Sequence, residues 1–309
     1  ENLDGPLSKA SGFAFYNTSK YDFEKLLAEP QQLAKNLQDY INGFSKNMRD
    51  VVEKFDFENT VAKLDAANLL FKVVERFADA SKIDLSVYDP CCGSGGMLTI
   101  AKERIQDINP DAEVHLFGQE VNPQTYAVSR SDLYIKSADG RDAENIAFGS
   151  VLSKDGHADR TFDYLLANPP YGKDWNLDAE FVRAEAARAA GNRFHAGLPS
   201  ISDGQLLFLQ HMLGRMHQPL AGVSRVSIIM NGSPLFTGDA GSGPSEIRRW
   251  ILEEDYLEAL IALPQQLFYN TGISTYVWVL ANSKPAGRKE KVLLVDATEA
   301  WLPRRKSLG

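Results

Sequence analysis

The segment "LLANPPYGKDW", residues 165–175, carries residue types that could hold and orient an exocyclic amine. The carboxamide of Asn168 and the backbone carbonyl of Pro169 offer two acceptors for amine hydrogens, which would aim the nitrogen lone pair at an electrophilic methyl group. Tyr171 adds a face on which a planar group taken out of a duplex could stack. Pro169 and Pro170 stiffen this turn, although an Asn-Pro-Pro turn alone is equally consistent with an ordinary strand end and a surface tyrosine.

A glycine-rich segment, "VYDPCCGSGGML", predicts a ligand-binding loop between a strand and a helix. Glycines there let the backbone approach a ligand, and the helix N-terminus points N–H groups at it. A phosphate-binding P-loop needs Gly-Lys-Ser/Thr, which is missing, and a dinucleotide fingerprint needs Gly or Ala where Leu98 stands. S-adenosylmethionine remains, with Asp89 placed to hold its ammonium group. The predicted cofactor loop comprises Asp89, Pro90, Gly93, Ser94, Gly95 and Gly96.

Two further segments extend the predicted cofactor site. Glu120 ends the strand-like run "VHLFGQE", where a carboxylate can accept hydrogen bonds from both ribose hydroxyls. A surface glutamate at a strand end is the alternative interpretation. Gly149 and Ser150 follow a third short strand and would line an adenine site. Asn168 is assigned to the cofactor site as well as to the catalytic turn.

Composition and charge limit the class of protein. The 309 residues are 44% hydrophobic and 24% charged, which is typical of a soluble globular chain with one large α/β domain and a smaller unit. There is no apolar run long enough for a membrane span and no secretory leader, so we expect a cytoplasmic protein. Cys91 and Cys92 are adjacent, which disfavours a disulfide, and no metal site is expected. The net charge of −8 is unfavourable for binding of nucleic acid by this chain without a partner.

The period of the apolar residues predicts two domains. Residues 1–80 are expected to form an N-terminal tail and helical domain, because residues 21–79 carry helical stripes and no strand pattern. In residues 81–309 strands alternate with helices, which is typical of an α/β domain with a doubly wound, mostly parallel sheet.

Three segments of the second domain carry separate expectations. The last two strand-like runs, joined by "SKPAGRKE", are predicted to form an antiparallel hairpin at or near the sheet edge. Residues 173–204 are expected to form a loop or lid after the Asn-Pro-Pro-Tyr turn. The basic tail from residue 283 could contact phosphates.

Two motifs, "DPCCGSGG" followed by "NPPYG", resemble the pattern of adenine-N6 DNA methylases. The runs "SGFAFYNTSKYDF", "IMNGSPLFTG", "SEIRRWILE" and "LPQQLFYNTGIST" resemble the modification (methylation) subunit of type I restriction–modification systems, and the similarity covers nearly the whole chain. The resemblance implies a seven-stranded S-adenosylmethionine-dependent methyltransferase fold with an N-terminal helical domain. It also implies methylation of adenine N6 in DNA, a separate specificity subunit, a restriction or translocase subunit, and two modification subunits per complex.

The sequence departs from this family at two places. Ser150 stands where members usually have an acidic residue, which affects a contact to the cofactor adenine. A segment containing Thr-Pro is missing between Asp79 and Ile83. Either the subfamily lacks it or a piece is absent from the sequence, and the abrupt join favours the second.

Two other classes of function stay open. A protein glutamine-N5 methyltransferase needs the same Asn-Pro-Pro-Tyr turn, because its substrate is also a planar amide nitrogen, and product analysis distinguishes it. A non-catalytic methyltransferase-like assembly subunit would bind partners only. The presence of Asp89, Glu120, Asn168 and Tyr171 argues against that class, and cofactor titration tests it.

Overall fold

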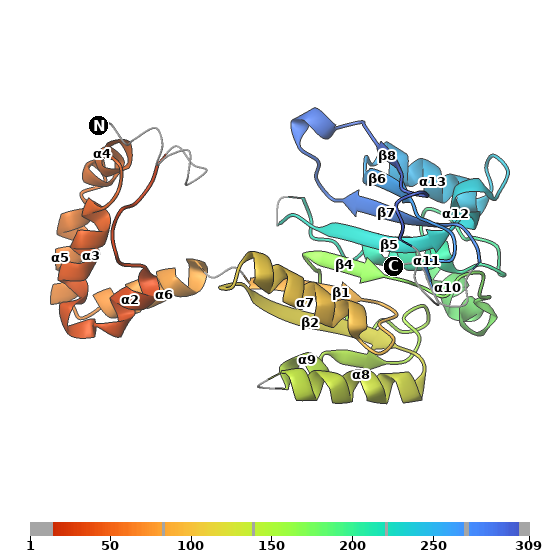
Figure 1. Ribbon diagram of the computed structural model, residues 1–309, viewed down its shortest axis with the longest axis horizontal. Helices are drawn as coiled ribbons and strands as arrows, with labels where there is room; N and C mark the ends of the chain where they lie inside the picture. Colours follow the sequence, from red (N-terminus) through yellow and green to blue (C-terminus); the bar gives the residue numbers. More distant parts are fainter. Residues whose placement is uncertain (1–14, 82–83, 138–139, 220–221, 269–271, 303–309) are drawn as a thin grey trace. The chain divides into compact units, whose positions relative to one another are not determined.

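A computed structural model describes residues 15–81, 84–137, 140–219, 222–268 and 272–302 (Figure 1). The chain divides into two compact units, Glu1–Ile83 and Asp84–Gly309, each with its own hydrophobic core. The expectation of an absent segment falls at their junction, where helix α6 ends at Ser81 and residues 82–83 lie outside the described residues. No described helix is long and apolar enough to cross a membrane.

The first unit is helical, as predicted. Its elements are α2 (Phe23–Ala28), the 3-10 turn η1 (Pro30–Gln32), α3 (Leu33–Asn42), α4 (Lys46–Lys54), α5 (Phe57–Ala66) and α6 (Leu70–Ser81). The prediction of helical stripes in residues 21–79 is confirmed in α3, since Leu33, Leu37 and Ile41 are buried at successive turns. The chain turns between α5 and α6 at Asn68, where φ is +55°. Both helices bury apolar residues in the same core as α3.

The second unit is built on an eight-stranded sheet in the order β3-β2-β1-β4-β5-β7-β6-β8. Its strands are β1 (Asp84–Asp89), β2 (Glu113–Glu120), β3 (Ile146–Phe148), β4 (Tyr164–Ala167), β5 (Arg225–Asn231), β6 (Leu257–Ala262), β7 (Thr275–Ala281) and β8 (Leu293–Asp296). The connecting elements are α7 (Gly96–Ile108), α8 (Pro123–Lys136), α9 (Arg141–Glu144), η2 (Asn176–Asp178), α10 (Ala179–Ala186), α11 (Gln205–Leu213), α12 (Ser233–Phe236), α13 (Gly243–Glu253) and η3 (Ala286–Arg288).

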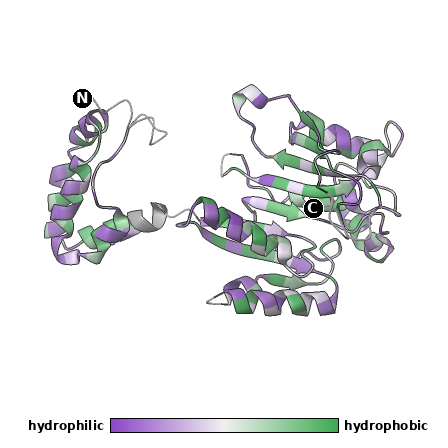
Figure 2. Ribbon diagram, viewed as in Figure 1, coloured by the Kyte–Doolittle hydropathy of each residue, from purple (hydrophilic) through white to green (hydrophobic). Residues whose placement is uncertain are grey.

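The strands bury their apolar residues between the helices. In β5 the alternate residues Val226, Ile228 and Met230 are fully buried, and Trp278 of β7 packs in the same core. Figure 2 shows mainly hydrophobic residues along the strands, whereas hydrophobic and hydrophilic residues alternate along the helices. Burial of this kind is the main force that holds the sheet to its helices.

The strand order reverses beside β1, which is where open α/β sheets bind ligands. The chain runs outward from β1 to β2 and β3, then returns to β4 on the other side of β1. Because β1 and β4 are parallel neighbours, their carboxyl ends lie side by side. Asp89 ends the first of these strands and Asn168 follows the second.

The prediction of a doubly wound, mostly parallel sheet is confirmed, but two of its details are wrong. The sheet has eight strands rather than seven. The last two strands do not form an antiparallel hairpin, because β6 lies between them and β8 pairs with β6 in parallel. The connection is long enough to cross the start of β6, and Lys284 holds it there by donating to the carboxylate of Asp255 and to the carbonyl of Lys291. In this way β8 covers backbone groups that β6 would otherwise leave unpaired.

The expectation of an open loop or lid at residues 173–204 is also wrong. The segment contains η2 and α10, and its side chains Trp175, Val182 and Phe194 are buried. They form a small core with Leu207 of α11 and with two residues of the loop that follows β3. The segment is therefore a packed part of the domain.

Candidate active site

Four parallel strands end at one edge of the sheet, and each brings a predicted site segment there. Asp89 is the last residue of β1, and Glu120 is the last residue of β2. Gly149 follows β3 and Asn168 follows β4. Because these strands are neighbours, their carboxyl ends meet. The structure therefore brings the predicted residues together, while their roles stay predictions.

Asp89 is a buried carboxyl group at the point where the strand order reverses. It is 2% exposed, and its Oδ1 accepts a hydrogen bond from the Cys91 N–H at 2.9 Å. Burial raises the pKa of Asp89 to about 7, with the charge of Glu120 acting in the same direction and the hydrogen bond from Cys91 opposing it. Pro90 beside it is buried. A neighbouring cation would favour the charged carboxylate, so this position suits an ammonium group.

The glycine loop leaves open space in front of α7. Gly93 and Gly95 have φ of +56° and +82°, a region that glycine adopts without strain, and Ser94 between them is exposed. A Cβ atom on Gly93 or Gly96 would meet nothing within 4 Å. A Cβ on Gly95 would lie 2.9 Å from Ser129 Oγ of α8. The loop is therefore packed against α8 at Gly95 and open at the glycines on either side.

Glu120 holds the glycine loop to the end of β2. Its Oε2 accepts from the Gly93 N–H at 2.9 Å, and its Oε1 accepts from the Asn122 N–H at 2.7 Å. The residue is 8% exposed. A carboxylate has about four lone-pair positions, so both oxygens keep capacity for hydroxyl donors. This link to the loop is a contact that the sequence did not predict.

Gly149 and Ser150 are the first two residues of the loop that follows β3. Gly149 has φ of +118°, and its N–H donates to the carbonyl of Glu120 at 2.9 Å. A Cβ at this position would meet nothing within 4 Å. Ser150 is half-buried, and its carbonyl accepts from the N–H of Lys154 at 2.9 Å.

Two apolar side chains beside these residues were missed from the sequence. Val121 follows Glu120, Phe148 precedes Gly149, and each is 56% exposed. Tyr126 of α8 packs against Phe148, with ring centroids 5.1 Å apart. The sequence could have indicated them, because each is an apolar residue next to a predicted ligand-binding residue, and solvent-facing strand ends are usually polar. Together they provide apolar surface for a flat heterocycle.

The Asn-Pro-Pro-Tyr turn exposes its polar group. Asn168 and Pro170 are exposed, whereas Pro169 is buried and anchors the turn. The Tyr171 hydroxyl donates a hydrogen bond to Asn168 Oδ1 at 2.5 Å. A neighbouring hydroxyl therefore already uses one of the two acceptor positions of the predicted amine acceptor.

An aromatic pair lies over this turn. The rings of Tyr171 and Phe268 meet edge to face, with centroids 6.5 Å apart and planes at 67°. Burial raises the pKa of Tyr171 to about 12, and the charge of a Cys91 thiolate would act in the same direction. The turn follows β4, the parallel neighbour of the strand β1 that leads into the glycine loop. Phe268 was not among the predicted site residues, although it belongs to the quoted run "LPQQLFYNTGIST".

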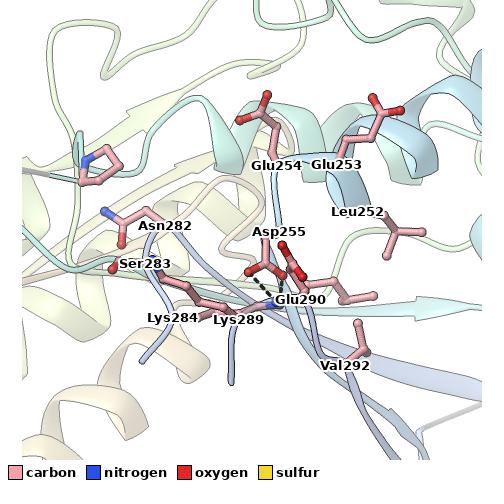
Figure 3. A pocket seen from close by; sticks show the side chains of 12 residues that line it. Leu252, Glu253, Glu254, Asp255, Asn282, Ser283, Lys284, Lys289, Glu290 and Val292 are labelled. Atoms are coloured by element: carbon pink, nitrogen blue, oxygen red, sulfur yellow. Dashed lines mark hydrogen bonds and ion pairs between the residues drawn. The ribbon is translucent and has the colours of Figure 1, made fainter. Parts of the chain in front are cut away.

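A cavity of about 640 Å³ lies at the opposite edge of the sheet (Figure 3). Leu257, at the start of β6, and Asn282, after β7, line it, and both lie near the amino end of β5. The Asp255–Lys284 ion pair crosses its wall. It contains none of the predicted site residues.

Comparison with known families gives the decisive observation. The family described as N-6 DNA Methylase matches residues 65–307, and the HsdM N-terminal domain matches residues 2–77. The chain belongs to the N-6 DNA methylase family. The resemblance inferred from the motifs is confirmed.

Relatives of this family member are methylase subunits of type I restriction enzymes. The MjaIX subunit of Methanocaldococcus jannaschii is 29% identical over 229 residues, covering 72% of this chain and 38% of the relative. The MjaVII subunit of the same organism is 30% identical, covering 74% and 37%. The HindI subunit of Haemophilus influenzae is 29% identical, covering 69% and 44%. The chain thus spans about two fifths of the length of these relatives.

Solved structures show the same fold. A type I methyltransferase subunit from Streptococcus thermophilus superposes with a TM-score of 0.60 at 22% identity, covering 93% of this chain and 70% of that one. The methylase subunit of the EcoKI enzyme gives a TM-score of 0.50 at 21% identity, covering 69% and 44%. The methylase architecture is therefore shared at low sequence identity.

Proposed function

We propose that this chain transfers the methyl group of S-adenosylmethionine to N6 of adenine in DNA, within the modification subunit of a cytoplasmic type I restriction–modification complex. The observation that carries the proposal is the meeting of the buried acids Asp89 and Glu120 with the Asn168–Tyr171 turn at one sheet edge. The partners in this proposal are DNA, a specificity subunit, a restriction or translocase subunit, and a second modification subunit.

The residues at this edge fit S-adenosylmethionine. Asp89 suits its ammonium group, and Glu120 keeps acceptor capacity for the ribose hydroxyls. The open positions at Gly93 and Gly96 leave room for the amino-acid end in front of α7. The apolar surface of Val121 and Phe148, beside Gly149 and Ser150, suits the adenine ring. When bound, the cofactor supplies an electrophilic methyl group on a sulfonium centre.

The turn supplies orientation for the target amine. Asn168 Oδ1 and the Pro169 carbonyl accept its two hydrogens, which directs the nitrogen lone pair toward the methyl group. As the nitrogen forms its new bond it becomes acidic, and the two oxygens stabilise its positive charge until a proton passes to water. No strong base is required. Tyr171 and Phe268 provide aromatic surface for an adenine taken out of the duplex.

The hydroxyl of Tyr171 competes with the target amine for Asn168 in this mechanism. Tyr171→Phe keeps the ring and removes the competing donor, so we expect kcat/KM for DNA to rise by about 2- to 10-fold, the worth of a net hydrogen bond of ~0.5–1.5 kcal/mol. Initial rates with tritium-labelled S-adenosylmethionine measure the effect. Tyr171→Ala serves as the matched variant and should lose activity, because it removes the stacking ring. Equal losses in both variants would show that the hydroxyl assists the reaction instead.

Glu120 should matter for cofactor affinity. We expect Glu120→Ala to weaken binding of S-adenosylmethionine by about 1–3 kcal/mol, because the ribose hydroxyls and the Gly93 N–H lose their acceptor. Isothermal calorimetry gives the affinity directly. Glu113→Ala, at the exposed start of the same strand, is the control and should bind like the wild type. An unchanged affinity in Glu120→Ala would place the ribose elsewhere.

Product analysis tests the proposed function against its alternatives. The chain is assembled with a specificity subunit and incubated with labelled S-adenosylmethionine, duplex DNA and a protein mixture. We expect the label in N6-methyladenine after nuclease digestion. Label in methylglutamine would support the protein methyltransferase instead. Cofactor binding without any transfer would favour a non-catalytic assembly role.

A further inference from the structure

The loop that carries Gly149 and Ser150 is tied down by Gln119, which is 1% exposed in β2. Gln119 Nε2 donates to the carbonyl of Gly149 at 3.1 Å and to that of Lys154 at 2.8 Å. Its Oε1 accepts from the Gly156 N–H at 3.0 Å. One carboxamide thus fixes both ends of the loop to the sheet.

Arg193 holds the middle of the same loop, although it comes from the segment that follows the Tyr171 turn. Its NH1 group donates to the carbonyl of Val151 at 2.8 Å, and its NH2 group donates to that of Leu152 at 3.3 Å. Glu185 of α10 accepts from Nε at 2.8 Å and from NH2 at 2.6 Å. NH1 also contacts His211 Nδ1 of α11 at 3.0 Å. A single guanidinium group therefore joins three separate segments.

The geometry uses the full donor capacity of Arg193. A guanidinium has five N–H groups, and each has an acceptor among these contacts. Because arginine only donates, His211 accepts through Nδ1 and carries its proton on Nε2, which faces the Tyr88 hydroxyl at 2.9 Å. The side chains of Arg193 and Glu185 are 9% and 12% exposed. A buried ion pair is retained without large cost only when its hydrogen bonds are satisfied, as they are here. Lysine has one nitrogen and cannot reproduce this fork.

Apolar side chains also pack the loop after β3 against the segment at residues 173–204. Val151 and Leu152 of the loop share a core with Trp175 and Val182 of the segment. Trp175 lies four positions after Tyr171, and its backbone N–H donates to the carbonyl of Ile201 at 3.1 Å. This hydrogen bond joins the two ends of the segment, and both ends therefore lie near the Asn-Pro-Pro-Tyr turn.

We propose that Arg193 and Glu185 form a positioning pair that fixes the cofactor-side loop at Ser150 relative to the target-side turn at Asn168–Tyr171. The inference rests on the proposed function, which gives these two segments their roles. Neither residue belongs to the predicted binding set, and each acts through the backbone that it holds. Loss of the guanidinium fork loosens both segments together.

The test compares Arg193→Lys with Arg225→Lys in the full chain assembled with a specificity subunit. Arg225 is a control ion pair remote from both segments, because its side chain, 43% exposed, contacts buried Glu258 at 2.6 Å at the other edge of the sheet. In Arg193→Lys we expect roughly 10-fold weaker binding of S-adenosylmethionine and roughly 100-fold lower kcat, since a misplacement of ~1 Å remote from the chemistry can cost about 10²-fold. Hydrogen exchange of the backbone N–H groups should accelerate in residues 149–156 and 171–176 alike. The control should change none of these quantities.

The outcomes separate positioning from simple stabilisation. A merely structural role would lower the unfolding temperature of Arg193→Lys and leave cofactor affinity and kcat of the folded protein unchanged, which would overturn the proposal. Acceleration of exchange in only one of the two segments would also overturn it. If the wild type, assembled with a specificity subunit, binds cofactor but methylates no DNA, the proposed function fails while the affinity comparison still decides the inference. If it binds no cofactor, the exchange experiment decides alone.

Discussion

Replacement of Asn168 by alanine is expected to lower the rate of methyl transfer by about three powers of ten or more, while the affinity for S-adenosylmethionine stays almost unchanged. The side chain is exposed at the end of β4 and supplies one of the two acceptors proposed for the amine. Its loss leaves the nucleophile unoriented, whereas the other contacts proposed for the cofactor lie at or just after the ends of β1, β2 and β3. Single-turnover rates with saturating cofactor and DNA measure the effect.

Two variants sharpen this experiment. Asn168→Asp keeps an acceptor oxygen and should retain more activity than the alanine variant. Asn176→Ala removes an exposed carboxamide from η2 and should behave like the wild type. Retention of more than a tenth of wild-type activity by Asn168→Ala would reject the proposed mechanism.

The second large effect concerns partners. Purified alone, the chain is expected to bind S-adenosylmethionine but to show no site-selective methylation until a specificity subunit is added. The net charge of −8 disfavours independent binding to DNA. The segment at residues 173–204 is unsuited to recognise a DNA sequence without another subunit. It is packed into the domain, and its Arg193 makes internal contacts.

Gel-shift and methylation assays at one fixed salt concentration test this expectation. Specific complexes typically exceed non-specific ones by about 10³- to 10⁷-fold in affinity, so addition of the subunit should produce a clear change. A matched DNA lacking the recognition site is the control. Site-selective methylation by the single chain would instead indicate a self-sufficient methylase.

The sequence predicted strands well where the pattern is local. The motifs that contain Asp89, Glu120 and Asn168 correctly placed these residues at strand ends. The partner of β8 was missed, because alternation identifies a strand and not its neighbour. Pairing of β8 with β6 depends on how the intervening connection crosses the sheet.

The rest of the candidate site depends on contacts between distant segments. Residues 173–204 look exposed by composition, yet Trp175 and Phe194 are buried against the loop after β3. No local pattern shows that Arg193 would meet backbone carbonyls about forty positions earlier. Phe268 likewise reaches Tyr171 only through the folded sheet.

The position of β4 between β1 and β5 also governs the order in which the molecule can fold during translation. Strands β1, β2 and β3 leave the ribosome first, and β1 then presents one unpaired edge at Val87 and Tyr88. That edge is covered only when residues 164–167 have emerged, and until then it is open to pairing with other chains. The half of the sheet that carries the proposed cofactor contacts therefore completes its fold only together with the strand that carries the proposed target turn.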